Sequence, residues 1–219
     1  MDIRILHSNN IQEESYGILS EDLSRISASE PAMLERSSQF YREALESNRL
    51  VVAINGAVSN IVGSGLLLPL SKGWAEVSGI YVHKDYRGNK IGEKVLGAIK
   101  ELGKIHNVNL LLTMKPSIHG SEGMIVEASK NDFHPVSFEF LKKYPDTYKN
   151  CCVCYDNDGS KNCKDRDSIC VLGIEGNIDG ASKAGDEFII SGQFNSAITS
   201  NVVREKVLTY LKKSNGNNQ

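Results

Sequence analysis

A short basic stretch that contains glycine, Tyr86-Arg87-Gly88-Asn89-Lys90-Ile91-Gly92, has the residue types of an anion-binding loop. An apolar run, Ile80-Tyr81-Val82, ends just before it, and an amphipathic helical pattern begins just after it. At the start of a helix the backbone N–H groups have no partners within the helix, and the helix dipole is positive there. Glycine lets the backbone approach a ligand because it has no Cβ. The stretch is therefore predicted to hold a phosphate group.

One carboxylate lies on the strand that is expected to lead into this loop. Glu76 stands eleven residues before Arg87. A carboxylate that is partly buried beside a bound ligand can have a raised pKa and can act as a general base. The alternative is a solvated strand glutamate near Trp74, and the residues alone do not decide between the two.

Composition limits the class of protein. A chain of 219 residues is long enough for one full domain or for a domain with an appendage. The net charge of −2 and the absence of a basic block argue against a nucleic-acid partner. No stretch approaches the roughly 20 apolar residues of a membrane helix, and the first residues lack a signal-peptide core. We therefore expect a cytoplasmic enzyme or binding domain that has no membrane partner.

The five cysteines are confined to the stretch from Cys151 to Cys170. Cys151 and Cys154 form one CxxC pair, but no second CxxC follows. If residues 151–155 form a strand, Cys152 and Cys154 share one face and Cys151 points away, which disfavours a zinc knuckle. Buried reduced thiols are the favoured interpretation, and no metal site is expected.

The N-terminal half contains the patterns of a strand, two helices and a hairpin. A strand is predicted at residues 2–6, followed by helical residues 11–47 in two pieces that are broken near Ser29-Glu30-Pro31. Ser29 would cap the second piece, and Pro31 would lie in its first turn. Residues 50–54 and 57–70 would pair around Asn55-Gly56, with a bulge at Gly63 and Gly65.

The remaining patterns place the loop near the centre of a mixed α/β (α+β) domain. A strand at residues 75–82 and a helix at 91–105 flank the loop. Further elements are predicted after them: a strand at 108–114, a helix at 122–130, and strands at 136–140 and 151–155. Residues 1–155 would form this domain. Residues 156–219 would form a C-terminal extension, with strands at 169–174 and 187–191, a helix at 195–211 and a disordered tail at 213–219.

The loop and its context resemble the acyl-CoA-binding motif of the GNAT N-acetyltransferase family. That motif is Gln or Arg, two residues, Gly, one residue, then Gly or Ala, and here it is Arg87, Gly88-Asn89, Lys90, Ile91, Gly92. The resemblance is firm over residues 75–112 and looser from the N-terminus to 155. It implies the GNAT fold, a mixed and mostly antiparallel central sheet flanked by helices.

The resemblance also implies an activity and a set of site residues. Acetyl-CoA would be the co-substrate, and its acetyl group would pass by direct attack to a primary amine of a small molecule or amino acid. Glu76 would be the general base, and a backbone N–H would polarise the thioester carbonyl. The pantetheine arm would lie along Ile80, Tyr81 and Val82, and the pyrophosphate would bind Arg87, Gly88, Asn89, Lys90, Ile91 and Gly92.

Two positions depart from the family pattern. The family usually has glycine where this chain has Lys90, whose ammonium could pair with a phosphate but whose Cβ narrows the turn. If Phe133 closes the following helix, Ala128 takes the place of the family's usual tyrosine acid. These departures keep open an alternative, namely an inactive acyl-CoA-binding or protein-interaction module. The segment Phe133-His134-Pro135 also loosely resembles amino-acid acetyltransferases such as N-acetylglutamate synthase. A homodimer is a further possibility.

Overall fold

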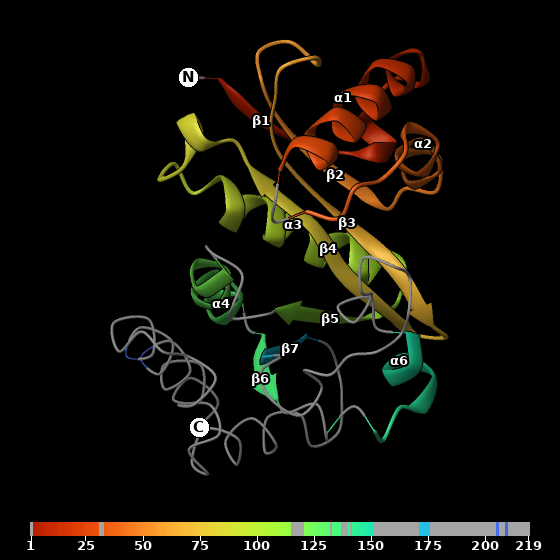
Figure 1. Ribbon diagram of the computed structural model, residues 1–219, viewed down its shortest axis with the longest axis vertical. Coiled ribbons are helices and arrows are strands. Elements are labelled where there is room, and N and C mark those ends of the chain that lie inside the picture. Colours follow the sequence, from red (N-terminus) through yellow and green to blue (C-terminus); the bar gives the residue numbers. More distant parts are fainter. Residues whose placement is uncertain are drawn as a thin grey trace. The chain divides into compact units, whose positions relative to one another are not determined.

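The computed structural model describes residues 2–30, 33–114, 121–131, 133–136, 140, 142–150, 171–175, 205 and 209 (Figure 1). The chain divides into two units. The first contains residues 1–68 and 77–107, and the second contains residues 69–76 and 108–219. Strands β3 (Ile61–Ser71) and β4 (Trp74–Val82) contribute residues to both units.

The sheet of the first unit is antiparallel over β1 (Ile3–His7), β2 (Leu50–Asn55) and β3. This confirms the predicted N-terminal strand and hairpin. The register between β2 and β3 shifts where Ala53 pairs with Gly63 and Ile54 pairs with Ile61. Val62 is therefore one extra residue on β3, next to Gly63, where the glycines predicted an irregularity.

The connection between β2 and β3 is longer than the predicted two-residue Asn-Gly turn. Gly56 has a φ of +74°, as its position after Asn55 led us to expect. However, the Asn55 N–H donates to the carbonyl of Asn60 at 3.0 Å, and β3 begins only at Ile61. The prediction of a strand from residue 57 is therefore wrong for 57–60, which belong to the turn.

Two helices, α1 (Tyr16–Ser29) and α2 (Ser38–Glu46), form one layer of this unit. The Oγ of Ser37 accepts the Phe40 N–H at 3.2 Å and caps α2. The prediction that Ser29 caps the second helix is wrong, because Ser29 is the last residue of α1 and the second helix begins nine residues later. Pro31 lies outside the described residues, and the start of α2 at Ser38 excludes it from the first turn of that helix.

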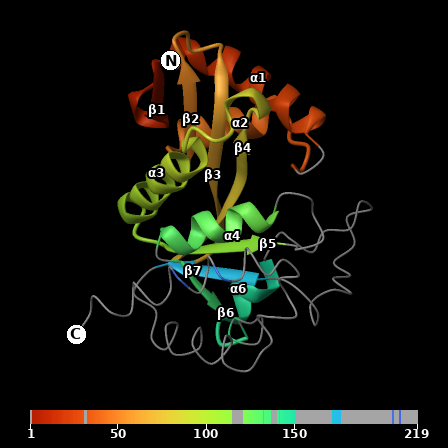
Figure 2. The ribbon, with the colours of Figure 1, turned by 90° about the vertical axis from the view of Figure 1, so that its left-hand side faces the viewer.

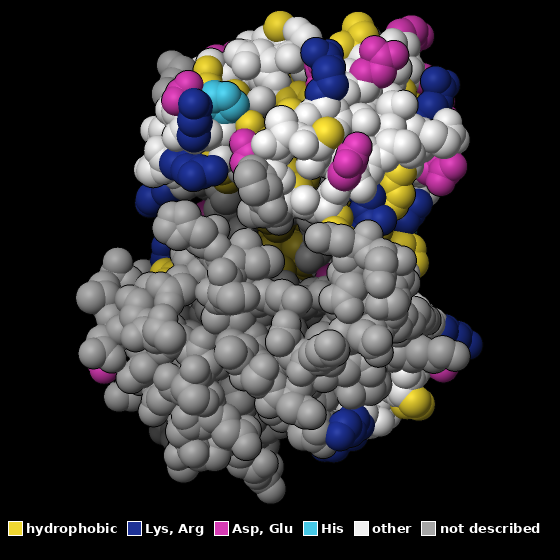
Figure 3. Space-filling model, in the orientation of Figure 1, with side chains coloured by type: hydrophobic (Ala, Val, Ile, Leu, Met, Phe, Trp, Pro, Cys, Tyr) yellow, Lys and Arg dark blue, Asp and Glu magenta, His cyan; other side chains and the backbone are white. Residues whose placement is uncertain are grey.

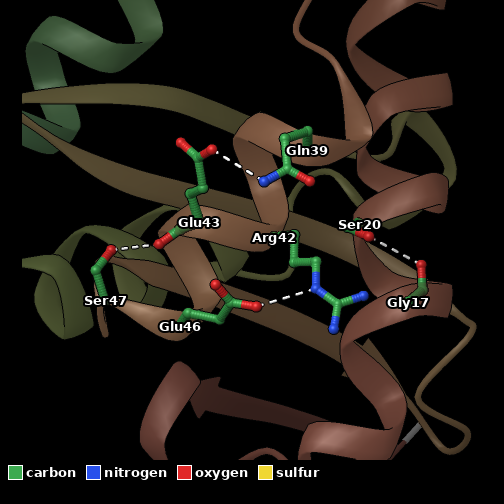
Figure 4. Close-up of polar contacts among 7 residues, drawn as sticks. All are labelled: Gly17, Ser20, Gln39, Arg42, Glu43, Glu46 and Ser47. Carbon is green, nitrogen blue, oxygen red and sulfur yellow. Dashed lines mark hydrogen bonds and ion pairs between the residues drawn. The ribbon is translucent and has the colours of Figure 1, made fainter.

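The outer face of α2 is stabilised by its own side chains (Figure 4). Gln39 donates to the Glu43 carboxylate at 3.0 Å, and Arg42 pairs with Glu46 at 3.0 Å, both across one helical turn. Ser47 donates to the carbonyl of Glu43 at the end of the helix. These groups satisfy one another, so this face is a solvated helix surface.

Helix α3 (Ile91–Ile105) packs on β1 and β2, on the opposite face of the sheet from α1 and α2 (Figure 2). The predicted helix at 91–105 is confirmed in full. Gly63 and Gly65 lie under it, and a methyl group placed on Gly65 would come within 2.8 Å of Val95 Cγ1. The core of the unit consists of residues that are almost completely buried: Leu19, Leu23, Tyr41, Leu45, Leu50, Ile54, Val95, Leu96 and Ile99.

In the second unit, residues Trp74–Glu76 of β4 pair in parallel with β5 (Asn109–Met114). Strand β7 (Val171–Glu175) is antiparallel to β5 and also to β6 (His134–Val136). The mixed, mostly antiparallel sheet is confirmed, because β4 and β5 form the one parallel pair among the strand pairs whose register is known. The strand predicted at 169–174 is confirmed over residues 171–174 as β7. The strand predicted at 136–140 is confirmed only at Val136, the last residue of β6, because residues 137–139 lie outside the described residues and Phe140 is helical.

Helices α4 (Ser121–Lys130) and α6 (Pro145–Asn150) complete the described part of the second unit. The Phe133 N–H donates to the carbonyl of Ala128 at 3.1 Å, and both residues are buried, so Phe133 does close α4. Tyr144 packs against Trp74 with ring centroids 4.8 Å apart. Four predictions lie wholly or largely outside the described residues: the strand and cysteine cluster at 151–170, the strand at 187–191, the tail at 213–219, and the helix at 195–211, of which only Glu205 and Thr209 are described, both helical. A domain boundary at 155/156 stays a prediction.

Short 3₁₀ turns link several of these elements, at Ser8–Asn10, Glu13–Ser15 and Lys84–Tyr86. In the described part of the chain, no helix has the length and apolar character needed to cross a membrane.

Candidate functional site

The β4–α3 loop, residues 83–90, joins a buried strand to the start of a buried helix. The His83 N–H donates to the carbonyl of Val62 at 2.9 Å, so pairing with β3 continues to the end of β4. The turn Lys84–Tyr86 follows at once, and the Asp85 N–H donates to His83 Nδ1 at 3.3 Å. The predicted order of strand, loop and helix is therefore present within one unit.

Two residues of the loop have left-handed backbone conformations. Gly88 has a φ of +82°, and Lys90, the N-cap residue of α3, has a φ of 58° and a ψ of 21°. No side chain caps the helix at Lys90. Within the described residues, no backbone hydrogen bond engages the N–H groups of Gly88, Lys90 or Gly92. The start of α3 thus presents donors to an external anion, as a phosphate site requires.

Side chains of the loop brace it against the strand. Arg87 Nε donates to the carbonyl of Val82 at 3.2 Å, and Asn89 Nδ2 donates to the carbonyl of Tyr86 at 3.0 Å. Lys84, Arg87 and Lys90 are all exposed. Lys and Arg side chains gather on the surface where Figure 1 places this loop (Figure 3). Preorganised donors and a basic surface both fit a pyrophosphate group.

Glycine at position 92 leaves room beside the loop. A methyl group placed on Gly92 would lie 3.6 Å from Val82 Cγ2, which is an ordinary contact. The space at this position would therefore accommodate alanine, in agreement with the Gly-or-Ala pattern of the motif. We conclude that the loop residues fit the acyl-CoA pyrophosphate that the motif implies.

The edge of β4 offers further backbone donors. Because the His83 N–H points to β3, alternation along the strand points the Tyr81 backbone to β3 as well and turns Ile80 and Val82 to the opposite edge. Pairing of β4 with β5 extends only from Trp74 to Glu76. Among the described residues, no strand pairs with the Ile80 and Val82 edge. An extended ligand arm would find donors at Ile80 and Val82, whereas the Tyr81 backbone faces β3.

Sequence reasoning did not identify Gly79 as a special position. Its φ is +59°, and a methyl group placed on it would lie 3.0 Å from Leu66 Cδ2. The neighbouring Ile80 side chain lies on the other face of the sheet, next to Gly65 and α3. The signal in the sequence was an isolated glycine inside a strand, which is typical of a bulge or a close approach. A left-handed residue there interrupts the regular alternation that Glu76 to Val82 would otherwise have.

Glu76 is 3% exposed and lies in the second unit, where it pairs with Leu111 as the last residue of the parallel ladder with β5. The alternative interpretation of Glu76 as a solvated strand residue is therefore wrong, because the side chain is buried. Burial of this kind is a feature of functional carboxylates, although structural carboxylates are also buried.

The Tyr81 side chain is 6% exposed and lies on the side of β4 that faces α1. Burial raises the pKa of the Tyr81 phenol, and the Glu30 carboxylate acts in the same direction, while Arg87 opposes both. The phenol therefore stays protonated at neutral pH and keeps a hydroxyl donor.

In the part of the chain that the structure describes, no group of three or more His, Cys, Asp or Glu residues is placed to hold a metal ion. The cysteine stretch from Cys151 to Cys170 lies outside that part, so the expectation of no metal site stays a prediction for it.

Three solved structures of other proteins are similar to the structure of this chain. An acetyltransferase of the GNAT family from Staphylococcus aureus Mu50 is 24% identical, covers 62% of this chain and 87% of its own, and has a TM-score of 0.46. N-acetylglutamate synthase from Neisseria gonorrhoeae, complexed with coenzyme A and N-acetyl-glutamate, is 12% identical over 80% of this chain with a TM-score of 0.52. This chain spans only 35% of the length of that protein.

Rv2747 from Mycobacterium tuberculosis, in complex with CoA, is 12% identical, covers 81% of this chain and all of its own, and has a TM-score of 0.51. These similarities concern the fold. No curated protein sequence matches the chain. The sequence model of a family described as "Acetyltransferase (GNAT) family" matches residues 16–119. These residues contain α1 to β5 and the whole β4–α3 loop. Fold and family match thus agree with the site geometry, and residues 16–119 of the chain belong to the acetyltransferase (GNAT) family.

Proposed function

We propose that this protein transfers an acetyl group from acetyl-CoA to a primary amine of a small molecule or amino acid. The observation that carries the proposal is the start of α3, where Gly88 and Lys90 are left-handed and no side chain caps the helix. Membership of residues 16–119 in a family of acetyltransferases supports acyl transfer in general. Solved structures with a similar fold were determined with coenzyme A, which supports the choice of co-substrate.

In this proposal the β4–α3 loop binds the pyrophosphate. Its backbone N–H groups donate to the phosphate oxygens, and Arg87 and Lys90 add positive charge. The pantetheine arm runs along the edge of β4 at Ile80 and Val82. A backbone N–H of that edge polarises the thioester carbonyl and stabilises the negative charge that develops on its oxygen.

Glu76 is the proposed general base. It accepts the proton that the amine loses as the amine nitrogen attacks the thioester carbon. The carbon–sulfur bond then breaks, and the coenzyme A thiolate leaves and takes up a proton. Ala128 supplies no hydroxyl for that last step, and a thiolate is a good enough leaving group to accept its proton from water.

Calorimetry with acetyl-CoA tests the binding half of the proposal. We expect saturable binding to the full chain, weakened by Arg87→Gln. The absence of heat at millimolar acetyl-CoA would refute the proposal.

Coenzyme A release with a panel of amines tests the chemical half. General base catalysis contributes roughly 10² to 10⁴ in rate, so Glu76→Gln should lower turnover within that range and leave acetyl-CoA binding intact. Glu101→Gln is the matched control, because Glu101 is exposed near the far end of α3. Equal turnover in Glu76→Gln and Glu101→Gln at every pH would remove Glu76 from the mechanism.

The second candidate function is an inactive module that binds acyl-CoA or a protein partner. Ala128 favours it, because this position is buried in α4 and carries no hydroxyl. Steady thiol release with any amine of the panel would exclude this candidate. A cytoplasmic location and a homodimer also remain proposals, to be tested by cell fractionation and by sedimentation.

A further inference from the structure

A cavity of about 420 Å³ lies within the first unit, between α1, the β2–β3 connection and β4. Asp22 and Arg25 line it from α1, Asn60 from the connection, Ile61 from the start of β3, and Tyr81 and His83 from the end of β4 and the residue after it. Tyr81 lies between Ile80 and Val82. The cavity therefore adjoins the segment of β4 along which we place the acyl arm.

The two charged residues of the cavity differ strongly in exposure. Asp22 and Arg25 form an ion pair across one turn of α1, and the Asp22 side chain is 17% exposed while the Arg25 side chain is 77% exposed. Arg25 can leave the pair at little cost, because water solvates its guanidinium almost fully. Asp22 cannot lose a cationic partner as easily, because it is largely withdrawn from water.

This asymmetry selects the charge of the ligand. A cationic ligand can replace Arg25 at Asp22 and release Arg25 into solvent, so both carboxylate and guanidinium remain satisfied. An anionic ligand at Arg25 would instead deprive Asp22 of its partner. The cavity therefore favours a cation over an anion.

The other lining groups supply apolar surface and hydrogen-bonding atoms for the rest of an alkyl amine. Ile61, and Ile26 on α1, supply apolar surface for a methylene chain. His83 Nδ1 accepts the Asp85 N–H, so the neutral imidazole carries its proton on Nε2. Tyr81 adds a hydroxyl, because burial keeps its phenol protonated.

We propose that this cavity binds one ammonium group of a diamine, with Asp22 as its carboxylate partner. A carboxylate stabilises the protonated form of an amine, so the nitrogen held at Asp22 cannot also be the nucleophile. The second amine of the same molecule accepts the acetyl group. Only this last step depends on the proposed acetyl transfer, because binding at Asp22 requires no acetyl-CoA.

A nuclear magnetic resonance titration of the full chain without acetyl-CoA tests the cavity. The probe is 1,4-diaminobutane, with n-butylamine and butyrate as comparison ligands, and the readout is the backbone amide shifts of Tyr81 and His83. We expect both amines to shift these signals and butyrate to leave them unchanged. Shifts caused by butyrate but not by the amines would overturn the proposal.

Two variants with opposite expected signs sharpen the test. Asp22→Asn should weaken diamine binding about tenfold, the contribution of one charge-assisted hydrogen bond. Arg25→Gln should tighten it up to about fivefold, because it removes an exposed competing cation. Weaker diamine binding in Arg25→Gln would mean that Arg25 does not compete with the diamine for Asp22, and the proposal would be wrong.

Glu21→Gln is the matched control, because Glu21 is exposed on α1 beside Asp22. This substitution removes one negative charge, as Asp22→Asn does. A loss in Glu21→Gln equal to that in Asp22→Asn would show general surface attraction and would refute the site. If Asp22→Asn fails to fold, judged by thermal melting, the sign of the Arg25→Gln effect still decides.

The outcomes separate this proposal from acetyl transfer. Diamine binding in a chain that does not bind acetyl-CoA keeps the cavity and refutes the transferase function. Acetyl-CoA binding with no diamine-induced shift refutes the cavity alone. With both ligands bound, we expect faster coenzyme A release with 1,4-diaminobutane than with n-butylamine.

Discussion

The glycines under α3 and the left-handed residues of the β4–α3 loop differ in what constrains them. In β3, a methyl group on Gly63 would lie 2.8 Å from Ile91 Cγ2 and 3.1 Å from the carbonyl oxygen of Tyr81. In the loop, a methyl group on Gly88 would meet nothing within 4 Å, but the φ of +82° is one that L-residues rarely adopt. Space limits the first region, and backbone conformation limits the second.

This difference separates the positions that build the fold from those that shape the site. The β3 glycines let α3 approach the sheet, so that its buried side chains reach the core. The loop residues direct N–H groups toward the place where we propose the pyrophosphate. Substitutions in β3 should therefore act mainly on stability, and those in the loop should act mainly on ligand binding.

The largest expected effect is that of Gly63→Ala. The new Cβ would press against the Tyr81 carbonyl, a backbone atom that cannot rotate away, so we expect the free energy of unfolding to fall by roughly 1 to 3 kcal/mol. Urea unfolding measures this loss. Because the loop itself is unchanged, acetyl-CoA affinity of the folded fraction should change far less.

Gly65→Ala is the matched comparison for Gly63→Ala. Its Cβ would meet Ile80 Cδ1 at 2.7 Å, which is the far end of a flexible side chain, and Val95 Cγ1 at 2.8 Å. We expect a smaller loss than for Gly63→Ala. A larger loss for Gly65→Ala would show that the α3 side chains, and not the β4 backbone, limit the space under the helix.

Gly88→Ala should have an intermediate effect on stability and the clearest effect on the ligand. A left-handed L-residue costs about 1 to 2 kcal/mol, which the loop can relieve by turning its N–H groups away. An energy of about 1 kcal/mol corresponds to roughly a fivefold loss of acetyl-CoA affinity, measurable by calorimetry. Gly92→Ala is the control, with ordinary contacts and no expected loss. Equal acetyl-CoA affinities in Gly88→Ala and Gly92→Ala would show that the backbone conformation at Gly88 does not affect binding.

The loop and α3 could be predicted because their signals are local. The basic and glycine-containing residues from Arg87 to Gly92 are contiguous, and the four- and three-residue spacing of Val95, Ile99 and Leu102 is complete within one helix. The exposed Lys90 could not be assigned a conformation in this way. Its left-handed φ is set by the loop that precedes it, and it is the physical reason why the family motif prefers glycine there.

The C-terminal part could be predicted less well because it depends on pairing between distant segments. Strand β7 was predicted from its apolar residues, but its place between β5 and β6 is fixed by register with Leu111 and Pro135. The prediction for the two helices of the first unit was wrong at their junction. Ser29 and Ser37 both have the residue type of a helix cap, and only packing decides which of them caps the second helix. The Asp22 and Arg25 cavity was missed because its walls come together only in the folded unit.

Lys90→Gly should have the smallest effect on stability, and it separates conformation from charge within the loop. Glycine removes the left-handed strain of Lys90 but adds freedom to the unfolded chain, so the two terms of about 1 kcal/mol each should nearly cancel. At low salt, Lys90→Gly should bind acetyl-CoA severalfold more weakly than the wild type. At high salt the two affinities should converge, because the exposed ammonium acts through an attraction that salt screens. Lys90→Arg keeps the charge and should keep the affinity. If Lys90→Gly still binds acetyl-CoA more weakly than the wild type at high salt, the Lys90 side chain shapes the site by more than a screened charge.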